Sequence, residues 1–234
     1  TVDAGLQQGM GYAESLDIPF AYSSNGKGFV EHDFLTGRER SLTMDEFPAP
    51  EELWARYSRA KGLEHPHSQE IVTAPYYQEH GGNRPRYYQC IAINRTLEAI
   101  AQGKDRILLV MATGTGKTRV SAALTDVLMR ARLVKNVLFL ADRVELVKQA
   151  KSAYGEYYPD WSLCNLCDNK HDVDARVVFS TYQTMIGAID TETASDGKPA
   201  FSPGHFDLII VDEAHRSIFK KYKDIFDHFD ALVV

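Results

Sequence analysis

Two short motifs constrain the fold of this chain more than any other feature of its sequence. The first, MATGTGKT, occupies residues 111–118 and follows a largely apolar run at 106–110. The second, LIIVDEAH, occupies residues 208–215, roughly ninety residues later. An apolar run, a Gly-rich turn and an amphipathic pattern after it predict a strand, a tight loop and a helix. Two acidic residues directly after another apolar run predict a second strand that presents them at its end, as in an open α/β sheet.

The first motif fits a loop that binds phosphate. Gly114 and Gly116 let the backbone turn so that successive N–H groups and the positive end of the next helix point to one place, which suits triphosphate oxygens. Lys117 is expected to bind the β- and γ-phosphates, and the Thr118 hydroxyl to ligand Mg²⁺. The alternative is a Gly-rich turn with a surface lysine. The predicted nucleotide contacts here are Thr113, Gly114, Thr115, Gly116, Lys117 and Thr118.

The acidic pair of the second motif predicts the other half of an ATP site. We expect Asp212 to hold Mg²⁺ through water, and Glu213 to orient and deprotonate the attacking water, because hydrolysis needs a base in line with the γ-phosphate. Adjacent acidic residues after a strand are often a solvated turn or a helix cap. The sequence D-E-A-H after four apolar residues is nevertheless a specific signal.

The remaining apolar runs predict a RecA-like α/β lobe. Short, continuously apolar strands indicate a parallel sheet that is covered on both faces. Two helical patterns between them, at 118–130 and 143–154, are expected to be crossover helices of βαβ units. The four predicted strands are 107–110, 137–141, 177–179 and 208–211.

The N-terminal part predicts the end of a different domain. An apolar stripe at 6–16 predicts a helix, and runs at 18–22 and 29–34 predict strands joined in a hairpin. A helix and a hairpin do not make a complete domain, so we expect a remnant whose beginning lies before Thr1. The stretch 44–82 predicts a linker with one short helix at 50–61. The predicted domains are thus 1–43, 44–82 and 83–234.

Composition excludes some classes of protein and leaves others open. The net charge of −6 over 234 residues argues against global attraction to nucleic acid, so any DNA contact requires a local groove. No apolar run approaches membrane-spanning length, and a cytoplasmic location is expected. Cys164, Cys167 and His171 would form most of a zinc site, but a lone C-x-x-C without a second pair is weak, and a loop is the favoured interpretation.

Several motifs resemble those of superfamily 2 helicases and translocases. The run A-T-G-T-G-K-T resembles their motif I, in which the first glycine of the usual phosphate loop is commonly missing; Met111 stands there in this chain. The run R-P-R-Y-Y-Q resembles their Q-motif, with Arg86 and Gln89 as expected ATP contacts. Gln89 can bond the adenine edge with both an amide donor and an acceptor. A helix start with aromatic anchors is the alternative.

Two strand ends resemble the motifs of the same superfamily that contact a nucleic-acid strand. These are L-A-D-R, with Arg143, and F-S-T-Y-Q-T, with Ser180, Thr181 and Gln183. Contacts of this kind hold phosphates without reading sequence, as translocation requires. Simple helix capping is the alternative. His215 is expected to couple the phosphate site to the nucleic-acid side, or else to be a satisfied core histidine.

Taken together, the motifs resemble the restriction (R) subunit of type I restriction-modification enzymes over nearly the whole chain. The resemblance implies an ATP-dependent translocase of double-stranded DNA that works with methyltransferase (M) and specificity (S) subunits. It also implies that Gln8 and Tyr12 support a nuclease site whose carboxylates lie before Thr1, and that a second lobe with an arginine finger follows. The alternatives are another superfamily 2 motor, such as a type III restriction subunit or a repair helicase, and an ATP-binding switch without turnover.

Overall fold

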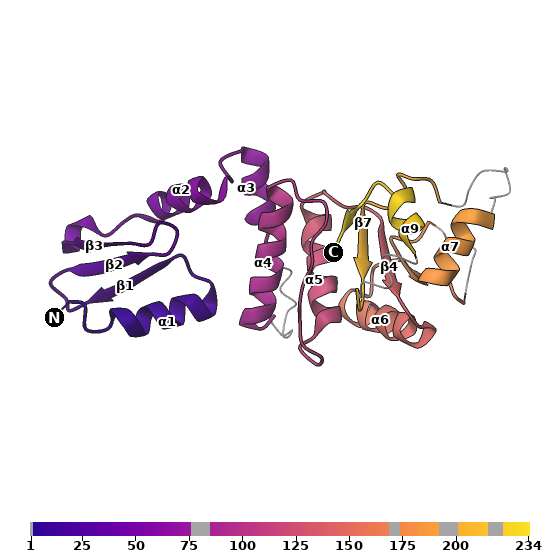
Figure 1. Cartoon of the computed structure of the whole chain (residues 1–234), viewed down its shortest axis with the longest axis horizontal. Coiled ribbons are helices and arrows are strands. Elements are labelled where there is room, and N and C mark those ends of the chain that lie inside the picture. Colours follow the sequence, from indigo (N-terminus) through magenta and orange to yellow (C-terminus); the bar gives the residue numbers. More distant parts are fainter. Residues whose placement is uncertain (1, 76–84, 169–173, 192–200, 215–221) are drawn as a thin grey trace. The chain divides into compact units, whose positions relative to one another are not determined.

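The chain folds into two compact units (Figure 1). The computed structural model describes residues 2–75, 85–168, 174–191, 201–214 and 222–234. Unit 1 comprises Thr1–Thr73 with Arg84–Gln102, and unit 2 comprises Ala74–Asn83 with Gly103–Val234. The helix that follows residue 86 therefore packs with unit 1, whereas the sequence assigns it to the domain 83–234. The three-part division stays a prediction.

Unit 1 contains a three-stranded antiparallel sheet with one helix packed on it. The sheet has the order β1-β2-β3, and α1 contacts β1 and β2. The predicted helix, hairpin and short helix are confirmed, and β3 and α3 are additional. The N-terminal helix buries Leu6 and Ala13 and exposes Leu16, so its apolar stripe is only partly covered. The elements of unit 1 are α1 (Leu6–Leu16), β1 (Phe20–Ser24), β2 (Phe29–Asp33), β3 (Arg38–Leu42), the 3₁₀ turn η1 (Met44–Glu46), α2 (Pro50–Lys61), α3 (Pro66–Val72) and α4 (Tyr87–Ala101).

A network of buried charges joins the sheet of unit 1 to α2. Glu31 is only 1% exposed, and its carboxylate accepts hydrogen bonds from Arg40 and Arg56 at 2.8 Å. Arg56 also donates to Asp33 at 2.7 Å. Burial raises the pKa of the Glu31 carboxyl, but hydrogen bonds from Arg56, Arg40 and Tyr22 outweigh it and lower the pKa to about 2. The network therefore stabilises the fold only while the carboxylates are ionised.

This network predicts a pH-dependent stability of unit 1. We expect Arg56→Ala to lower the free energy of unfolding of unit 1 by about 2 kcal/mol at pH 7, because it leaves a buried carboxylate short of a partner. Since the folded pKa of Glu31 lies near 2 and its ordinary value is 4.5, the stabilisation is present above pH 4.5. It is lost as the pH falls toward 2, so the two proteins should converge there.

Urea unfolding would measure this difference if one tryptophan reported on unit 1 alone. The chain has two tryptophans, so a Trp161→Phe background leaves Trp54 of α2 as the reporter. Arg38→Ala, a change at an exposed arginine of β3, is the matched control and should leave the midpoint nearly unchanged. A gap between Arg56→Ala and its parent that stays constant down to pH 3 would contradict the assignment.

Unit 2 is built around a five-stranded parallel sheet of order β5-β6-β4-β7-β8. This confirms the predicted parallel α/β lobe. The predicted helices and the strands at 137–141 and 208–211 are present within three residues of their expected bounds, whereas β5, β8, α7 and α9 are additional. The elements of unit 2 are α5 (Lys117–Arg130), β4 (Val137–Ala141), α6 (Val144–Tyr157), β5 (Leu163–Asn165), β6 (Val177–Thr181), α7 (Tyr182–Thr191), β7 (Leu208–Val211), α9 (Lys223–His228) and β8 (Leu232–Val233).

Both faces of this sheet are covered, as its continuously apolar strands predict. Phe139 of β4 and Phe179 of β6 pack against Tyr154 of α6 on one face. The alternate residues Leu138 and Val178 join a second cluster with side chains of α7 and α9. Every residue of β4 and β6 is consequently buried. The strands end in a common carboxyl edge, and the residues just beyond them are held in place by a rigid core.

The strand predicted at 107–110 is wrong. Arg106 forms a single parallel bridge to Val233, and the residues after it form no strand. Leu108 and Val110 are 72% and 89% exposed, which no inner strand of a covered sheet would be. The physical reason is the lack of a paired neighbour among the described residues, because an extended segment becomes a strand only where another strand bonds to it along its length.

Candidate functional site

The loop before α5 has the backbone that its sequence predicts. Gly114 and Gly116 adopt φ values of 79° and 86°, a left-handed conformation that costs residues with a Cβ about 1 kcal/mol or more. The helix starts at Lys117, and its first intrahelical hydrogen bond is donated by the Val120 amide to the Gly116 carbonyl. The three amides before it have no acceptor within the helix. The loop therefore directs N–H groups and the positive helix end to one point.

The acidic pair leaves the sheet at the carboxyl edge of β7. The Asp212 amide still donates to the Leu140 carbonyl of β4 at 2.9 Å, so the sheet fixes the position of Asp212. Glu213 then adopts a φ of 56°, which is uncommon for a residue other than glycine, asparagine or aspartate. This backbone turns the chain at the point where the two carboxylates diverge. Strain of this kind costs on the order of 1 kcal/mol and is often retained at functional positions.

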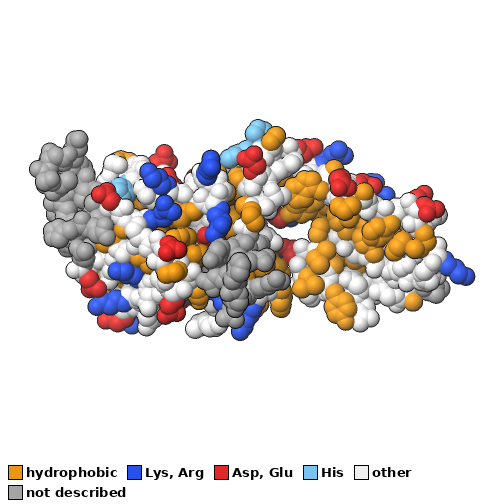
Figure 2. Space-filling view, turned by 180° about the vertical axis from the view of Figure 1, so that it is seen from behind, with side chains coloured by type: hydrophobic (Ala, Val, Ile, Leu, Met, Phe, Trp, Pro, Cys, Tyr) orange, Lys and Arg blue, Asp and Glu red, His pale blue; other side chains and the backbone are white. Residues whose placement is uncertain are grey.

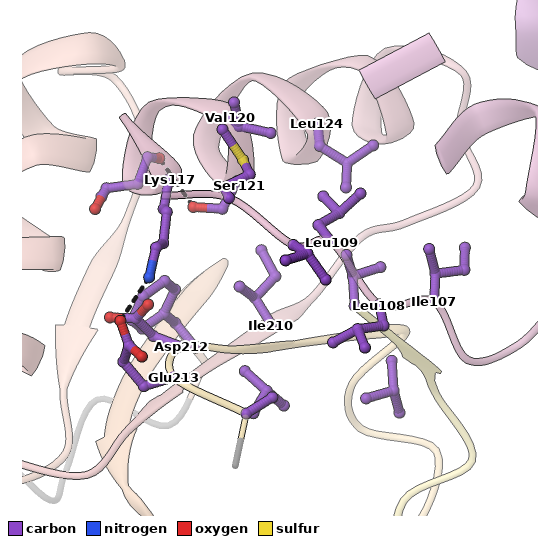
Figure 3. A pocket seen from close by; sticks show the side chains of 18 of the residues that line it. Ile107, Leu108, Leu109, Lys117, Val120, Ser121, Leu124, Ile210, Asp212 and Glu213 are labelled. Carbon is purple, nitrogen blue, oxygen red and sulfur yellow. Dashed lines mark hydrogen bonds and ion pairs between the residues drawn. The ribbon is translucent and has the colours of Figure 1, made fainter. Parts of the chain in front are cut away.

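Lys117 and Glu213 bring the two motifs into contact although 96 residues separate them. The Lys117 ammonium donates to the Glu213 carboxylate, with 2.5 Å between Nζ and Oε1 (Figure 3). The side chains are 34% and 42% exposed, so solvent reaches the pair. The hydrogen bond to Glu213 raises the pKa of the Lys117 ammonium. A permanent cation therefore lies at the mouth of the loop and beside two acidic side chains.

Asp212 lies in a less solvated position than its neighbour. Burial has the largest effect and raises the pKa of the Asp212 carboxyl. The negative charge of Glu213 raises this pKa further, and the positive charge of Lys117 lowers it. The charge of Asp142, which follows β4 at the same edge, adds to the raising. A divalent cation would oppose these effects, because it favours the ionised carboxylate. Asp142 is not among the site residues predicted from the sequence, where it appears only within L-A-D-R. The signal that identifies Asp212, an acidic residue directly after an apolar strand, also applies to Asp142.

A cavity of about 640 Å³ adjoins the pair and reaches into unit 2. Its polar end is formed by Lys117, Thr118, Asp212 and Glu213. The rest is apolar, and Figure 3 shows Val120 and Leu124 of α5, Ile210 of β7 and the residues 107–109 around it. Thr118 thus lies on the same cavity as Asp212, as a shared metal site requires. No group of three or more acidic, cysteine or histidine side chains suited to a metal occurs in the described ranges, so phosphate oxygens and water would have to complete the ligand set.

The residues expected to contact adenine lie at the start of α4 in unit 1, where Arg86 is the N-cap residue and Gln89 belongs to the first turn. The Arg86 amide donates to the Gln89 side-chain oxygen at 2.9 Å, and Gln89 is 5% exposed. The Arg86 guanidinium lies 3.3 Å from the Tyr88 hydroxyl. Gln89 thus helps to start its own helix, which is the alternative that the sequence left open. Its role toward a nucleotide stays a prediction.

The four residues expected to contact DNA fall into two groups. Arg143 precedes α6 with its side chain 75% exposed, and Gln183 is exposed on the first turn of α7. Ser180 is fully buried and donates to the Thr181 carbonyl at 3.0 Å. The Thr181 hydroxyl, 5% exposed, accepts from the Thr184 amide and caps α7. Thr181 thus caps a helix, which is the alternative that the sequence left open, and the contact of Ser180 and Thr181 with DNA stays a prediction.

The structure describes some of the remaining candidate residues but not all of them. Gln8 and Tyr12 lie on one face of α1, and the Gln8 amide donates to the Tyr12 hydroxyl at 2.8 Å. His215 and His171 lie outside the described residues. Cys164 is buried in β5, so packing accounts for it. Among the described residues, no helix has the length and apolar character needed to cross a membrane.

Comparisons with known proteins relate this chain to restriction enzymes. The family model described as type III restriction enzyme, res subunit, matches residues 83–234. The endonuclease subunit of the Escherichia coli type I restriction enzyme EcoAI is 35% identical over 98% of this chain and 29% of its own length. The corresponding EcoKI subunit of E. coli K12 is 28% identical over 94% of this chain and 21% of its own length. This chain thus spans less than a third of either relative.

A solved structure extends the similarity to the fold. A fragment of an HsdR subunit of a type I restriction enzyme from Vibrio vulnificus YJ016 matches the whole chain with a TM-score of 0.74 and 31% identity, and the match covers 40% of that fragment. The family model covers only the part that begins at residue 83, whereas the type I relatives also match the N-terminal part. The chain therefore belongs to the type III restriction enzyme res subunit family of superfamily 2 motors, and it is related over nearly its whole length to the endonuclease subunits of type I restriction enzymes.

Proposed function

We propose that this chain supplies the first ATP-binding lobe of an ATP-dependent DNA translocase within a type I restriction endonuclease subunit. One observation carries the proposal: Lys117 from the phosphate loop contacts Glu213 from the acidic motif, at the open end of a cavity that Thr118 and Asp212 also line. Two distant motifs that form one site are better support for ATP chemistry than either motif alone. The N-terminal match to type I subunits favours this motor over other members of the superfamily.

Each residue of the site has a defined role in this proposal. The backbone of Thr113–Gly116 and the first amides of α5 surround the phosphates, and Lys117 neutralises the β- and γ-phosphates. The Thr118 hydroxyl and the Asp212 carboxylate fit a hard cation, so they would hold Mg²⁺, which stabilises charge on the transferred phosphoryl group. Glu213 would accept the proton of the attacking water. Arg86 and Gln89 would contact the adenine.

The rest of the chain would connect this site to DNA and to partner subunits. Arg143 and Gln183, which are exposed after β4 and β6, would contact phosphates of double-stranded DNA, and His215 would couple them to the ATP site. Residues 1–43 would form the C-terminal end of a nuclease domain, in which Gln8 and Tyr12 support the nuclease site. Residues 44–82 would be a linker, and residues 83–234 the motor lobe. Methyltransferase and specificity subunits would supply sequence recognition.

ATP hydrolysis with and without duplex DNA tests this function. In a polypeptide that also contains a second motor lobe, we expect duplex DNA to raise the hydrolysis rate at least about tenfold, because DNA contacts position the catalytic groups. Arg143→Ala should reduce this stimulation without changing ATP affinity. Arg176→Ala, next to the amino end of β6 and thus at the opposite edge of the sheet, is the matched control. ATP binding without any DNA stimulation would instead support a switch module.

A further inference from the structure

The peptide unit between Asp212 and Glu213 sets the direction of both acidic side chains of the site. A rotation of this planar unit changes ψ of Asp212 and φ of Glu213 together. The observed orientation gives Glu213 a φ of 56°, a left-handed conformation that is disfavoured by a factor of about 5–30 for a residue with a Cβ. Interactions with the surrounding structure therefore have to hold this peptide unit in place.

Hydrogen bonds from the sheet and from α7 restrain this turn. The Asp212 amide donates to the Leu140 carbonyl of β4 at 2.9 Å. The Glu213 amide donates to the Asp212 carboxylate. The Tyr182 hydroxyl donates to the Asp212 carbonyl, with 3.5 Å between the two oxygens. The amide and the carbonyl of the peptide unit thus each have a partner, and the partner of the carbonyl belongs to α7.

Tyr182 lies in the core below the carboxyl edge of the sheet. Its side chain is fully buried, and its ring stacks on Tyr222, with 5.0 Å between the centroids and 15° between the planes. The ring belongs to the apolar cluster that joins α7 and α9 to the sheet (Figure 1). Burial raises the pKa of the Tyr182 hydroxyl, and the charges of Asp212 and Asp142 raise it further. The hydroxyl therefore remains a hydrogen-bond donor at neutral pH.

The helix α7 relates this contact to the proposed DNA side. Tyr182 is the first residue of α7, and the next residue, Gln183, is exposed and is proposed to contact DNA phosphates. The Thr181 hydroxyl caps the same turn by accepting from the Thr184 amide, so this turn moves as one body. At 3.5 Å, the contact of Tyr182 is longer than an ordinary O–H···O bond, and a small shift of α7 would shorten it.

Exposed charges are a weaker way to relate DNA to this site. On the part of Figure 2 that unit 2 forms, basic and acidic side chains of the described residues are interspersed, and neither sign forms a large area. The field of such a mixed surface is screened over about 10 Å at moderate salt. Packed side chains that connect two sites directly are the stronger route.

We propose that Tyr182 is a positioning residue that orients the Asp212–Glu213 peptide unit and transmits the position of α7 to Glu213. The inference rests on the proposed function for the role of Glu213 as a base, whereas the restraint on the peptide unit follows from the geometry. The hydroxyl keeps Glu213 directed at Lys117 and the phosphate loop (Figure 3). One hydrogen bond shifts a conformational equilibrium about fivefold, so without it negative φ values of Glu213 compete with the observed one.

The local part of the inference is tested with Tyr182→Phe, which removes the hydroxyl and keeps the stacked ring. Tyr154→Phe is the matched control, because Tyr154 is also fully buried and its hydroxyl donates to Ser121 of α5, at 3.0 Å. The nuclear Overhauser effect between the amide hydrogen and Hα of Glu213 reports on its φ, since a positive φ brings these hydrogens close together. In the chain as it stands, this effect should fall at least about twofold in Tyr182→Phe only.

The connection to DNA is tested by ATP hydrolysis in a polypeptide with both motor lobes. Tyr182→Phe should keep the KM for ATP and reduce the stimulation of kcat by duplex DNA at least about threefold. Tyr154→Phe should keep the stimulation of the parent. A general loss of packing would instead lower basal hydrolysis and ATP affinity in both variants.

Each part of the inference has its own contrary result. An unchanged Overhauser effect in Tyr182→Phe, or an equal decrease in both variants, would overturn the positioning role. Equal stimulation of Tyr182→Phe and its parent by DNA would overturn the connection through α7. A parent that binds ATP and shows no stimulation, together with the expected Overhauser effects, would refute the proposed translocase and leave the positioning of Glu213 established.

Discussion

Replacing the proposed general base by its amide, Glu213→Gln, should lower the rate of ATP hydrolysis by about 10²–10⁴-fold. The amide keeps the size of the side chain and an oxygen that can accept from Lys117, but it cannot take a proton from water. ATP binding should survive or become tighter, because the Lys117 ammonium no longer has a carboxylate as its partner. The measurement is steady-state hydrolysis in a polypeptide with both motor lobes, together with ATP affinity of the same protein.

The control for this variant is Glu156→Gln, an exposed position on α6. It changes the net charge by the same amount, and hydrolysis should be unchanged. Turnover by Glu213→Gln within threefold of the parent would remove Glu213 from the role of base, whereas a loss of ATP affinity would show that Glu213 acts in binding instead.

The second large effect is expected for Lys117→Ala, which should weaken binding of ATP with Mg²⁺ by about 100-fold. This corresponds to about 2.7 kcal/mol, within the range of a hydrogen bond to a charged group. Alanine also leaves Glu213 without its cation, so two carboxylates would then repel the triphosphate. The readout is the ATP-dependent shift of the melting temperature, which should disappear at concentrations that shift the parent by several degrees.

Lys223→Ala provides the matched control for this loss. Lys223 belongs to α9 of the same unit, with its side chain 72% exposed and paired to Asp227 at 3.1 Å. Removing it should leave the ATP-dependent shift intact. A shift that persists in Lys117→Ala would place the triphosphate elsewhere on the protein.

The two variants separate binding from chemistry because they change opposite ends of one ion pair. Lys117→Ala should lose affinity, and Glu213→Gln should keep affinity and lose turnover. A nucleotide switch that never hydrolyses ATP would show the first effect only. The pair of experiments thus distinguishes the proposed motor from its main alternative.

The parts of the fold that the sequence predicts correctly depend on local patterns. The strand β4 and the helix α2 were predicted with their observed bounds, since five consecutive apolar residues and a proline start are local signals. The strand expected at 107–110 has an equally apolar sequence. It forms no strand because only Arg106 bridges to β8, and pairing between segments distant in the sequence cannot be read from either one.

The site shows the same limit. The carboxyl-edge rule predicts that Asp212 and Glu213 lie where a ligand binds, but not that Glu213 contacts Lys117. The motif F-S-T-Y-Q-T suggests exposed hydroxyls, yet Ser180 and Thr181 are the last residues of an inner strand, and neighbouring layers cover them. A motif gives residue types, whereas burial depends on what the rest of the chain packs above them.

The ion pair between Lys117 and Glu213 has a kinetic consequence. The Glu213 carboxylate is paired with the Lys117 ammonium. If Lys117 binds the triphosphate as proposed, binding would therefore exchange one anion for another at this ammonium. Under the proposed function, Glu213 would become free to approach water only when phosphate has displaced it. After hydrolysis, the same carboxylate would compete with the departing phosphate for Lys117. In the proposed mechanism, Glu213 would thus act as a base only when ATP is bound, and it would in turn promote release of the phosphate product.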